Sequence, residues 1–183
     1  NNKIPIYDEL SYGGRPFTYL LGWPIMLIGV SKITSLNLKI ASAVLHILLG
    51  FLTLLLIGLI IISFTKNKKI VNLILLVLVL SPPFLYLFSA GNSFAAILFL
   101  STLGFFLFLK DRPIYLTLSA VSLSLISFFS FFATLFVLIS FLTYILIKCR
   151  NKLKWFFMTF FITFIIWFYN YYDFVIKYGL PET

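Results

Sequence analysis

Residues 39–64 read KIASAVLHILLGFLTLLLIGLIIISF, and after Lys39 this stretch contains no Asp, Glu, Lys or Arg. The hydrocarbon core of a bilayer, about 30 Å thick, is crossed by roughly 20 helical residues. The stretch exceeds that length and contains no proline, so it can continue as one helix. It therefore predicts a transmembrane helix.

The composition of the whole chain has the same character. Of the 183 residues, 62% are hydrophobic and 10% are charged, whereas soluble domains are about half apolar and about a quarter charged. A soluble fold of this size buries only about 70% of the surface that its unfolded chain exposes. We therefore expect lipid as the solvent, which excludes a soluble enzyme, a nucleic-acid-binding domain, a disulfide-rich secreted module and a disordered tail.

Five further apolar stretches approach the length of a membrane span. Pro82 and Pro83 interrupt the first of these stretches, and residues 114–147 are too long for one crossing, so we expect the chain to fold back at residues 127–130. The sequence predicts an all-α polytopic membrane protein with about six transmembrane helices, at residues 39–64, 70–88, 93–109, 113–129, 131–147 and 155–172.

A shorter apolar stretch at residues 17–30 precedes the first span. It reads FTYLLGWPIMLIGV and contains Gly22 and Pro24. Stretches shorter than a span are more often interfacial, re-entrant or buried than crossing. We expect it to form an interfacial helix that lies along the outer membrane surface.

Three parts follow from this segmentation. Residues 1–38 are the expected outer loop with its interfacial helix, residues 39–172 the transmembrane bundle, and residues 173–183 an outer tail that we expect to be cut short. The first residue is Asn1 and not methionine. We therefore expect the chain to be processed or to be a piece of a longer protein.

Basic residues lie mostly in three short runs between the apolar stretches. The net charge is +9, from 14 basic and 5 acidic residues. A nucleic-acid-binding surface would gather such charge on one face of a soluble domain, whereas polytopic membrane proteins carry it in their cytoplasmic loops. With six spans, all three runs fall on one side. We expect residues 65–69, 110–112 and 148–154 to be cytoplasmic, residues 1–35 to lie outside, and nucleic acid not to be a partner.

Candidate catalytic groups are few. Two of the five carboxylates, Asp8 and Glu9, lie together in the polar first loop, and Arg15 follows them. A carboxylate there can take a proton from an acceptor hydroxyl or amide, and an arginine can hold a phosphate through two hydrogen bonds. The alternative is a pair of solvated loop acids without a chemical role.

Other candidates could bind substrate. His46 is the one ionisable group expected well inside the membrane, which marks it as a functional candidate, although a neutral ring bonded to a neighbouring helix is the alternative. Tyr12 in the first outer loop, and Asn92 and Ser93 in the second, complete the candidate substrate-binding set. We predict no metal site, and we expect the single Cys149 to be inert, because the sequence has no zinc-ligand spacing.

The order of motifs in the first part of the chain resembles one family of membrane enzymes. RPFTYLL at residues 15–21 opens the expected interfacial helix, LKIASA at residues 38–43 enters a long span, and LSPPF at residues 80–84 breaks the next span. This order is similar to that of the type-C membrane glycosyltransferases that use lipid-phosphate-linked sugars, such as protein mannosyltransferases and aminoarabinose transferases. The likeness covers about residues 6–109.

This resemblance implies transfer of a sugar, with inversion, from a polyprenyl phosphate donor to an acceptor on the outer side. The family's first-loop acid falls on Asp8 or Glu9, as general base or acceptor-positioning group. The family usually keeps an acid in the second outer loop, where this chain has Gly91, Asn92 and Ser93. The resemblance implies no cofactor beyond the lipid-linked sugar, and the need for a divalent metal stays open.

Two other functions stay open beside the enzyme. The short length and the missing second-loop acid favour a non-catalytic integral-membrane subunit or scaffold, with other membrane proteins as partners. A transporter or channel is the third alternative. Such proteins tend to place ionisable groups near mid-membrane, and here His46 is the one candidate.

Overall fold

The computed structural model describes residues 22–65, 67–89 and 93–178, and within these ranges the chain forms helices and no strand. This confirms the predicted all-α class for the described residues. In chain order the elements are α1 (Gly22–Thr34), α2 (Leu38–Phe64), α3 (Lys68–Leu80), α4 (Pro82–Ser89), α5 (Phe94–Leu109), α6 (Pro113–Leu125), the 3-10 turn η1 (Ile126–Phe128), α7 (Phe131–Lys148), the 3-10 turn η2 (Arg150–Lys152) and α8 (Leu153–Tyr178).

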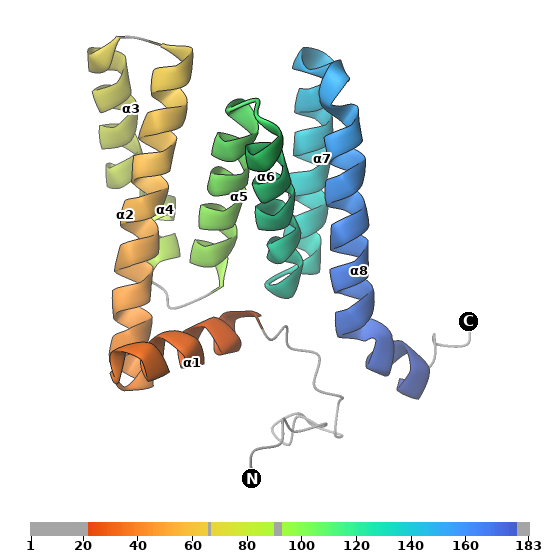
Figure 1. The fold of residues 1–183 in the computed structure, drawn as a ribbon. Coiled ribbons are helices and arrows are strands. Elements are labelled where there is room, and N and C mark those ends of the chain that lie inside the picture. Colours follow the sequence, from red (N-terminus) through yellow and green to blue (C-terminus); the bar gives the residue numbers. More distant parts are fainter. Residues whose placement is uncertain (1–21, 66, 90–92, 179–183) are drawn as a thin grey trace.

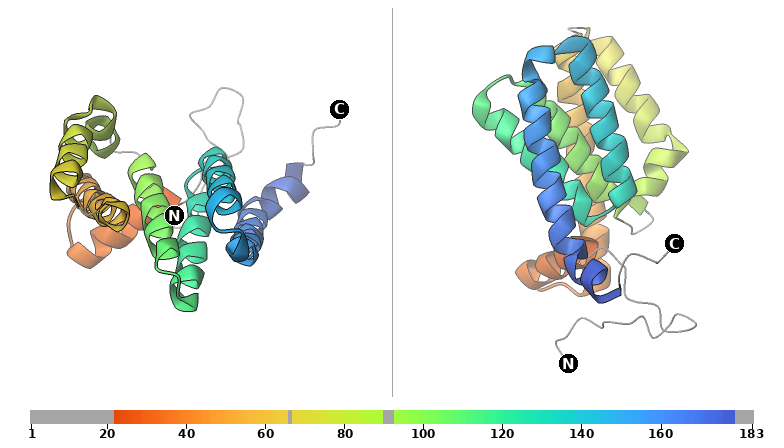
Figure 2. Two further views of the ribbon diagram at one scale, coloured as in Figure 1. Left: turned by 90° about the horizontal axis from the view of Figure 1, so that it is seen from above. Right: turned by 90° about the vertical axis from the view of Figure 1, so that its right-hand side faces the viewer.

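The helices from α2 to α8 run alongside one another, and α1 lies across one end of them (Figure 1). In order of contact, α3 and α4 pack on α2, α2 on α5, α5 on α6, α6 on α8, and α8 on α7. Seen from above, they form an open, curved row (Figure 2). The helix order in space therefore differs from the chain order, because α6 packs more extensively on α8 than on α7, the next helix in the chain.

The two ends of this row differ in charge. We call the end that α1 covers the α1 end. The opposite end, the basic end, holds the connections between α2 and α3, α5 and α6, and α7 and α8 (Figure 1). Its described basic residues are Lys68, Lys69, Lys110, Arg112, Lys148, Arg150, Lys152 and Lys154. The α1 end has fewer: Lys32 in the last turn of α1, Lys39 in the first turn of α2 and Lys177 near the end of α8.

Short polar side chains and prolines begin the helices. The Asn37 Oδ1 accepts a hydrogen bond from the backbone N–H of Ile40 at 2.9 Å, which caps α2. Ser130 caps α7 in the same way through the N–H of Ala133 at 3.2 Å. Such caps satisfy backbone donors that have no partner inside the helix. Pro113 begins α6, where the missing N–H costs nothing.

Several helix ends differ from the predicted spans. The span expected at residues 70–88 is divided at Ser81, because Pro82 has no N–H to continue the helix of α3. The described part of the expected helix at residues 17–30 continues to Thr34 and stops before Ser35, whose φ of 57° lies in the left-handed region. At the other end, α8 continues to Tyr178, directly before Gly179 and past the predicted limit of 172.

Two stretches of the described chain are long and apolar enough to cross a membrane, judged by length and composition: α2 and Arg150–Tyr169. Three further apolar helices, Phe94–Leu109, Pro113–Phe128 and Phe132–Lys148, are shorter than this criterion requires. The break at Ser81 shortens α3 in the same way. The predicted six spans are therefore not confirmed, although helices occupy all of their positions.

Serine side chains of α6 join it to the helices on both sides. Ser119 Oγ donates to the carbonyl oxygen of Gly104 in α5 at 2.7 Å. Ser124 Oγ lies 2.7 Å from the carbonyl oxygen of Ala120 in its own helix and 3.1 Å from that of Thr159 in α8, and it accepts a hydrogen bond from Thr163 Oγ1 at 3.1 Å. Ser119 and Ser124 are 1% and 0% exposed, so these polar groups need such partners. Buried hydroxyls thus fix α6 between α5 and α8.

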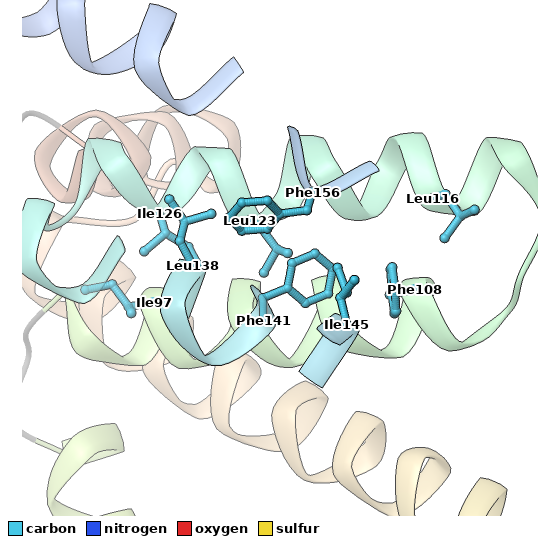
Figure 3. Packing of buried hydrophobic residues seen from close by; sticks show 9 residues of the cluster. All are labelled: Ile97, Phe108, Leu116, Leu123, Ile126, Leu138, Phe141, Ile145 and Phe156. Carbon is cyan, nitrogen blue, oxygen red and sulfur yellow. The ribbon is translucent and has the colours of Figure 1, made fainter. Parts of the chain in front are cut away.

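Apolar side chains fill the remaining space between α5, α6, α7 and α8 (Figure 3). Phe108 and Phe141 meet edge to face, with ring centroids 4.6 Å apart. This arrangement is favourable for aromatic quadrupoles and adds to the area that the rings bury. The buried members of this cluster are Ile97, Phe108, Leu116, Leu123, Ile126, Leu138, Phe141, Ile145 and Phe156.

Removal of the Ser124 hydroxyl should weaken the contact between α6 and α8. We expect Ser124→Ala to lower the free energy of unfolding by about 1 kcal/mol, because Thr159 and Thr163 lose a buried partner. Thermal unfolding of the purified protein in detergent measures the change. Ser140→Ala is the matched control, since Ser140 is exposed and its Oγ donates within α7, to the carbonyl oxygen of Phe136. Equal destabilisation of the two variants would contradict the prediction.

Candidate functional site

His46 lies in α2 on the side that α1 covers. Its side chain is 3% exposed, and its Nδ1 lies 2.7 Å from the carbonyl oxygen of Ser42 one turn earlier. Because a carbonyl can only accept, Nδ1 carries the proton in this hydrogen bond. This hydrogen bond is made within α2.

Trp23 of α1 covers the imidazole. The two ring centroids are 4.7 Å apart and the planes meet at 61°, which is an edge-to-face contact. Trp23 also packs on a cluster of buried residues from α2 and α5, which are Leu45, Leu49, Ala95 and Ala96. Two other side chains of α1, Met26 and Val30, pack on this cluster as well. The helix α1 thus packs across the ends of α2 and α5.

The first residue of α1 lies against the backbone of η1. A Cβ atom added to Gly22 would stand 2.6 Å from the carbonyl oxygen of Phe128. No side chain can occupy that space unless the backbone moves, so the close approach requires glycine at this position. Contacts at Gly22 and at Trp23 therefore hold α1 to η1 and to α2 at once.

The structure contains two of the seven residues that the sequence analysis selected as site residues. His46 is buried, and Ser93 precedes α5 at the α1 end, where its carbonyl oxygen accepts the N–H of Ile97 at 3.1 Å. The others lie outside the described residues: Asp8, Glu9, Tyr12, Arg15 and Asn92.

The chemistry available to the described residues is limited. Across residues 22–65, 67–89 and 93–178, no group of three or more His, Cys, Asp or Glu side chains could hold a metal ion. Trp23 and the α2 backbone both contact the buried imidazole of His46. These contacts link the ring to the position of α1, and the substrate-binding role expected for His46 stays a prediction.

Sequence reasoning did not find the partner of His46. Trp23 stands 23 positions earlier, in the stretch predicted to be interfacial, and only the packing of α1 across α2 brings the two rings together. The available signal was Trp23, a large side chain inside a short apolar helix before the first span. Its position indicates the face of that helix that packs on a neighbouring helix.

The single histidine of the chain offers a direct test of this contact. We expect Trp23→Ala to raise the rate at which diethyl pyrocarbonate modifies His46 by about tenfold, because loss of a large covering ring makes local opening easier. Mass spectrometry of the peptide that contains His46 measures the rate. Trp155→Ala at the basic end should leave the rate unchanged. Equal modification rates in the two variants would contradict the packing of Trp23 on His46.

Comparison of the chain with protein-family models, with curated proteins and with solved structures finds no match. The assignment of a function therefore depends on the residues and their arrangement.

Proposed function

We propose that the chain is an integral membrane protein with about six transmembrane helices, and that it transfers a sugar from a polyprenyl-phosphate-linked donor to an acceptor on the non-cytoplasmic side. In this proposal it is a type-C membrane glycosyltransferase or a fragment of one. The motif order at residues 15–21, 38–43 and 80–84 supports this relationship.

The distribution of apolar and polar side chains supports the membrane location. Large apolar residues point outward along the long helices, for example Ile47 at 72% exposed, Phe132 at 73% and Phe161 at 63%. Continuous apolar surfaces of this kind are unusual on soluble monomers. Inside, small and hydroxyl-bearing residues such as Gly104 and Ser119 meet between helices, as is common where helices pack in lipid.

The observation that carries the proposal is the opposition of the two ends. The described basic residues of the three helix connections lie at the basic end, and α1 lies at the other (Figure 1). Gly22 and Ser93, which closely follow the candidate residues 8–15 and 92 in sequence, are both at the α1 end. This arrangement supports an outer site at the α1 end and cytoplasmic loops at the basic end.

Helix ends of both directions lie at the same end. The amino-terminal ends of α2, α5 and α7 are at the α1 end, together with the carboxyl-terminal ends of α4, α6 and α8 (Figure 1). A phosphate is favoured beside an amino terminus, which carries partial positive charge. In this proposal the phosphate of the lipid-linked sugar therefore depends on Arg15.

In this mechanism each polar candidate has a separate task. Asp8 or Glu9 takes the proton of the acceptor as it attacks the sugar, and Arg15 holds the donor phosphate that leaves. Tyr12, Asn92 and Ser93 orient the sugar or the acceptor through hydrogen bonds. We assign His46 to the support of α1, which would line the donor's entrance from the membrane.

The experiment is a transfer assay with the full-length protein in liposomes. Polyprenyl phosphate-mannose and polyprenyl phosphate-aminoarabinose serve as donors, and a membrane extract serves as the acceptor source. We expect release of free polyprenyl phosphate from one of these donors, measured by mass spectrometry. Failure to release polyprenyl phosphate from either donor, with a stoichiometric membrane partner in the purified sample, would instead support the non-catalytic subunit.

A further inference from the structure

An apolar groove lies between α5, α6 and α7. Its volume is about 290 Å³, it is open to the outside, and its walls include Phe105 of α5, Leu123 of α6 and Val137, Phe141 and Tyr144 of α7. Small-molecule sites usually measure about 300–1,000 Å³. The groove is therefore at the lower limit of such sites, which suits a slender apolar group such as part of a hydrocarbon chain.

The two serine hydroxyls in the groove do not require a polar ligand. Ser101 Oγ donates to the carbonyl oxygen of Ile97 at 2.7 Å, and Ser140 Oγ donates to that of Phe136 at 2.8 Å. Both protons are thus used within the helices that carry the serines. An apolar occupant leaves these two serines as they are, which keeps the desolvation cost of its binding low.

A lysine, Lys148, lies beyond the groove on the side of the basic end. Phe136, Ser140 and Tyr144 follow one another at intervals of four residues along α7, and the next position in that row is Lys148. Four residues of helix rise by about 6 Å, so Lys148 lies about one turn beyond the groove. Lys110 follows the last residue of α5 at the same end, but its Nζ lies 4.7 Å from the ring centroid of Phe106, which is outside the groove.

The one carboxylate at the described basic end already has a partner. Asp111 Oδ1 lies 2.8 Å from Lys152 Nζ, and Lys152 also stands over the Phe108 ring at 4.7 Å from its centroid. This pair joins the α5–α6 connection to η2. The charges of Lys110 and Lys148 are left for an anion from outside the chain.

We propose that this groove binds one acyl chain of an anionic phospholipid, with the phosphate of its headgroup beside Lys148. The apolar walls match the chain, and the uncompensated Lys148 at one end matches the headgroup. The proposal rests on the membrane location proposed above but not on sugar transfer. The lipid differs from the sugar donor because its headgroup lies at the basic end and the donor phosphate at the α1 end.

Photo-crosslinking of the full-length protein in phosphatidylcholine nanodiscs tests the site. A small fraction of phosphatidylglycerol carries a diazirine in its acyl chain, and mass spectrometry identifies the labelled residues. We expect labels on the groove walls in α5 and α7. Ser140→Phe should reduce these labels by about tenfold, because the ring fills the open side of the groove. Ile139→Phe is the matched control, since Ile139 is 61% exposed and outside the groove.

A second variant tests the headgroup without changing the walls. Lys148→Gln should lower the preference for phosphatidylglycerol over phosphatidylcholine about fivefold, as expected for loss of one cation near an anionic headgroup. Lys32→Gln, an exposed position on α1, should leave the preference unchanged.

Each failure has a different meaning. Equal labelling of the groove in Ser140→Phe and Ile139→Phe would overturn the acyl-chain site, and equal use of the two phospholipids by the unsubstituted protein would overturn the headgroup assignment. Absence of label on every apolar face, that of Ile139 included, would instead overturn the membrane location.

Discussion

Replacement of Gly104 by leucine is expected to force α5 away from α6 and to destabilise the protein by roughly 3 kcal/mol, which corresponds to a thermal midpoint lower by about 6–12 °C. Overpacking of a filled core accounts for most of the loss, and one interhelical hydrogen bond accounts for the rest. Thermal unfolding of the purified protein in detergent measures the midpoint.

The expected size of this effect follows from the space around Gly104. A Cβ atom there would stand 2.6 Å from both Cγ and Cδ2 of Leu123 in α6. Leu123 is 2% exposed and belongs to the same buried cluster as Ile126, so movement of its side chain toward the groove would break that packing. Separation of the helices would also lengthen the 2.7 Å bond from Ser119 to the Gly104 carbonyl oxygen.

Gly29 provides the matched control. It lies in the helix α1, and a Cβ atom added there meets nothing within 4 Å. Gly29→Leu should therefore leave the midpoint unchanged or raise it slightly, since leucine favours helix more than glycine does. A Gly104→Leu protein as stable as the Gly29→Leu protein would contradict the packing of α5 on α6.

Local sequence signals were enough to predict most helices. Long apolar runs gave α2 and α5 nearly to the residue, since no proline interrupts them. The turn expected at residues 127–130 is present, because η1 ends at Phe128 and Ser130 caps α7. Pro82 marked the break between α3 and α4. Each of these features depends on the residues that are adjacent in the chain.

The arrangement of the helices could not be predicted in the same way. Ser124 and Thr159 meet across 35 positions, and nothing in an apolar run of constant composition indicates that α6 packs on α8 more than on α7. In the same way, Asp111 pairs with Lys152 because two helix connections lie side by side. Such pairs depend on tertiary packing, whereas hydrophobic periodicity predicts only secondary structure.

The candidate site has one part that the sequence predicted and one part that it did not. Its enclosed part, where Trp23 covers His46, comes from the structure, whereas its acids come from the sequence and the resemblance. Substitution of the acids is therefore the stricter test of the proposed chemistry. It changes no residue that the structure shows in the packing of the helices.

Substitution of both acids, Asp8→Asn with Glu9→Gln, is expected to lower the rate of sugar transfer by about 10²–10⁴-fold, the usual contribution of a general base. The amides keep the size and the hydrogen-bonding ability of the side chains, but they cannot take the proton of the acceptor. Release of polyprenyl phosphate in the liposome assay gives the rate.

The two acids are adjacent, so the single variants decide which one takes the proton. If Asp8 is the base, Asp8→Asn alone should reproduce most of the loss and Glu9→Gln should retain most of the rate; the reverse pattern would assign Glu9. Asp111→Asn at the basic end is the control for loss of a carboxylate, since it lies at the end opposite α1 and pairs with Lys152. A double variant with the rate of the unsubstituted protein would remove both acids from the chemistry. Because proton transfer is what the carboxylates are proposed to supply, a loss confined to the apparent affinity for the acceptor, with the maximal rate retained, would assign them to acceptor positioning.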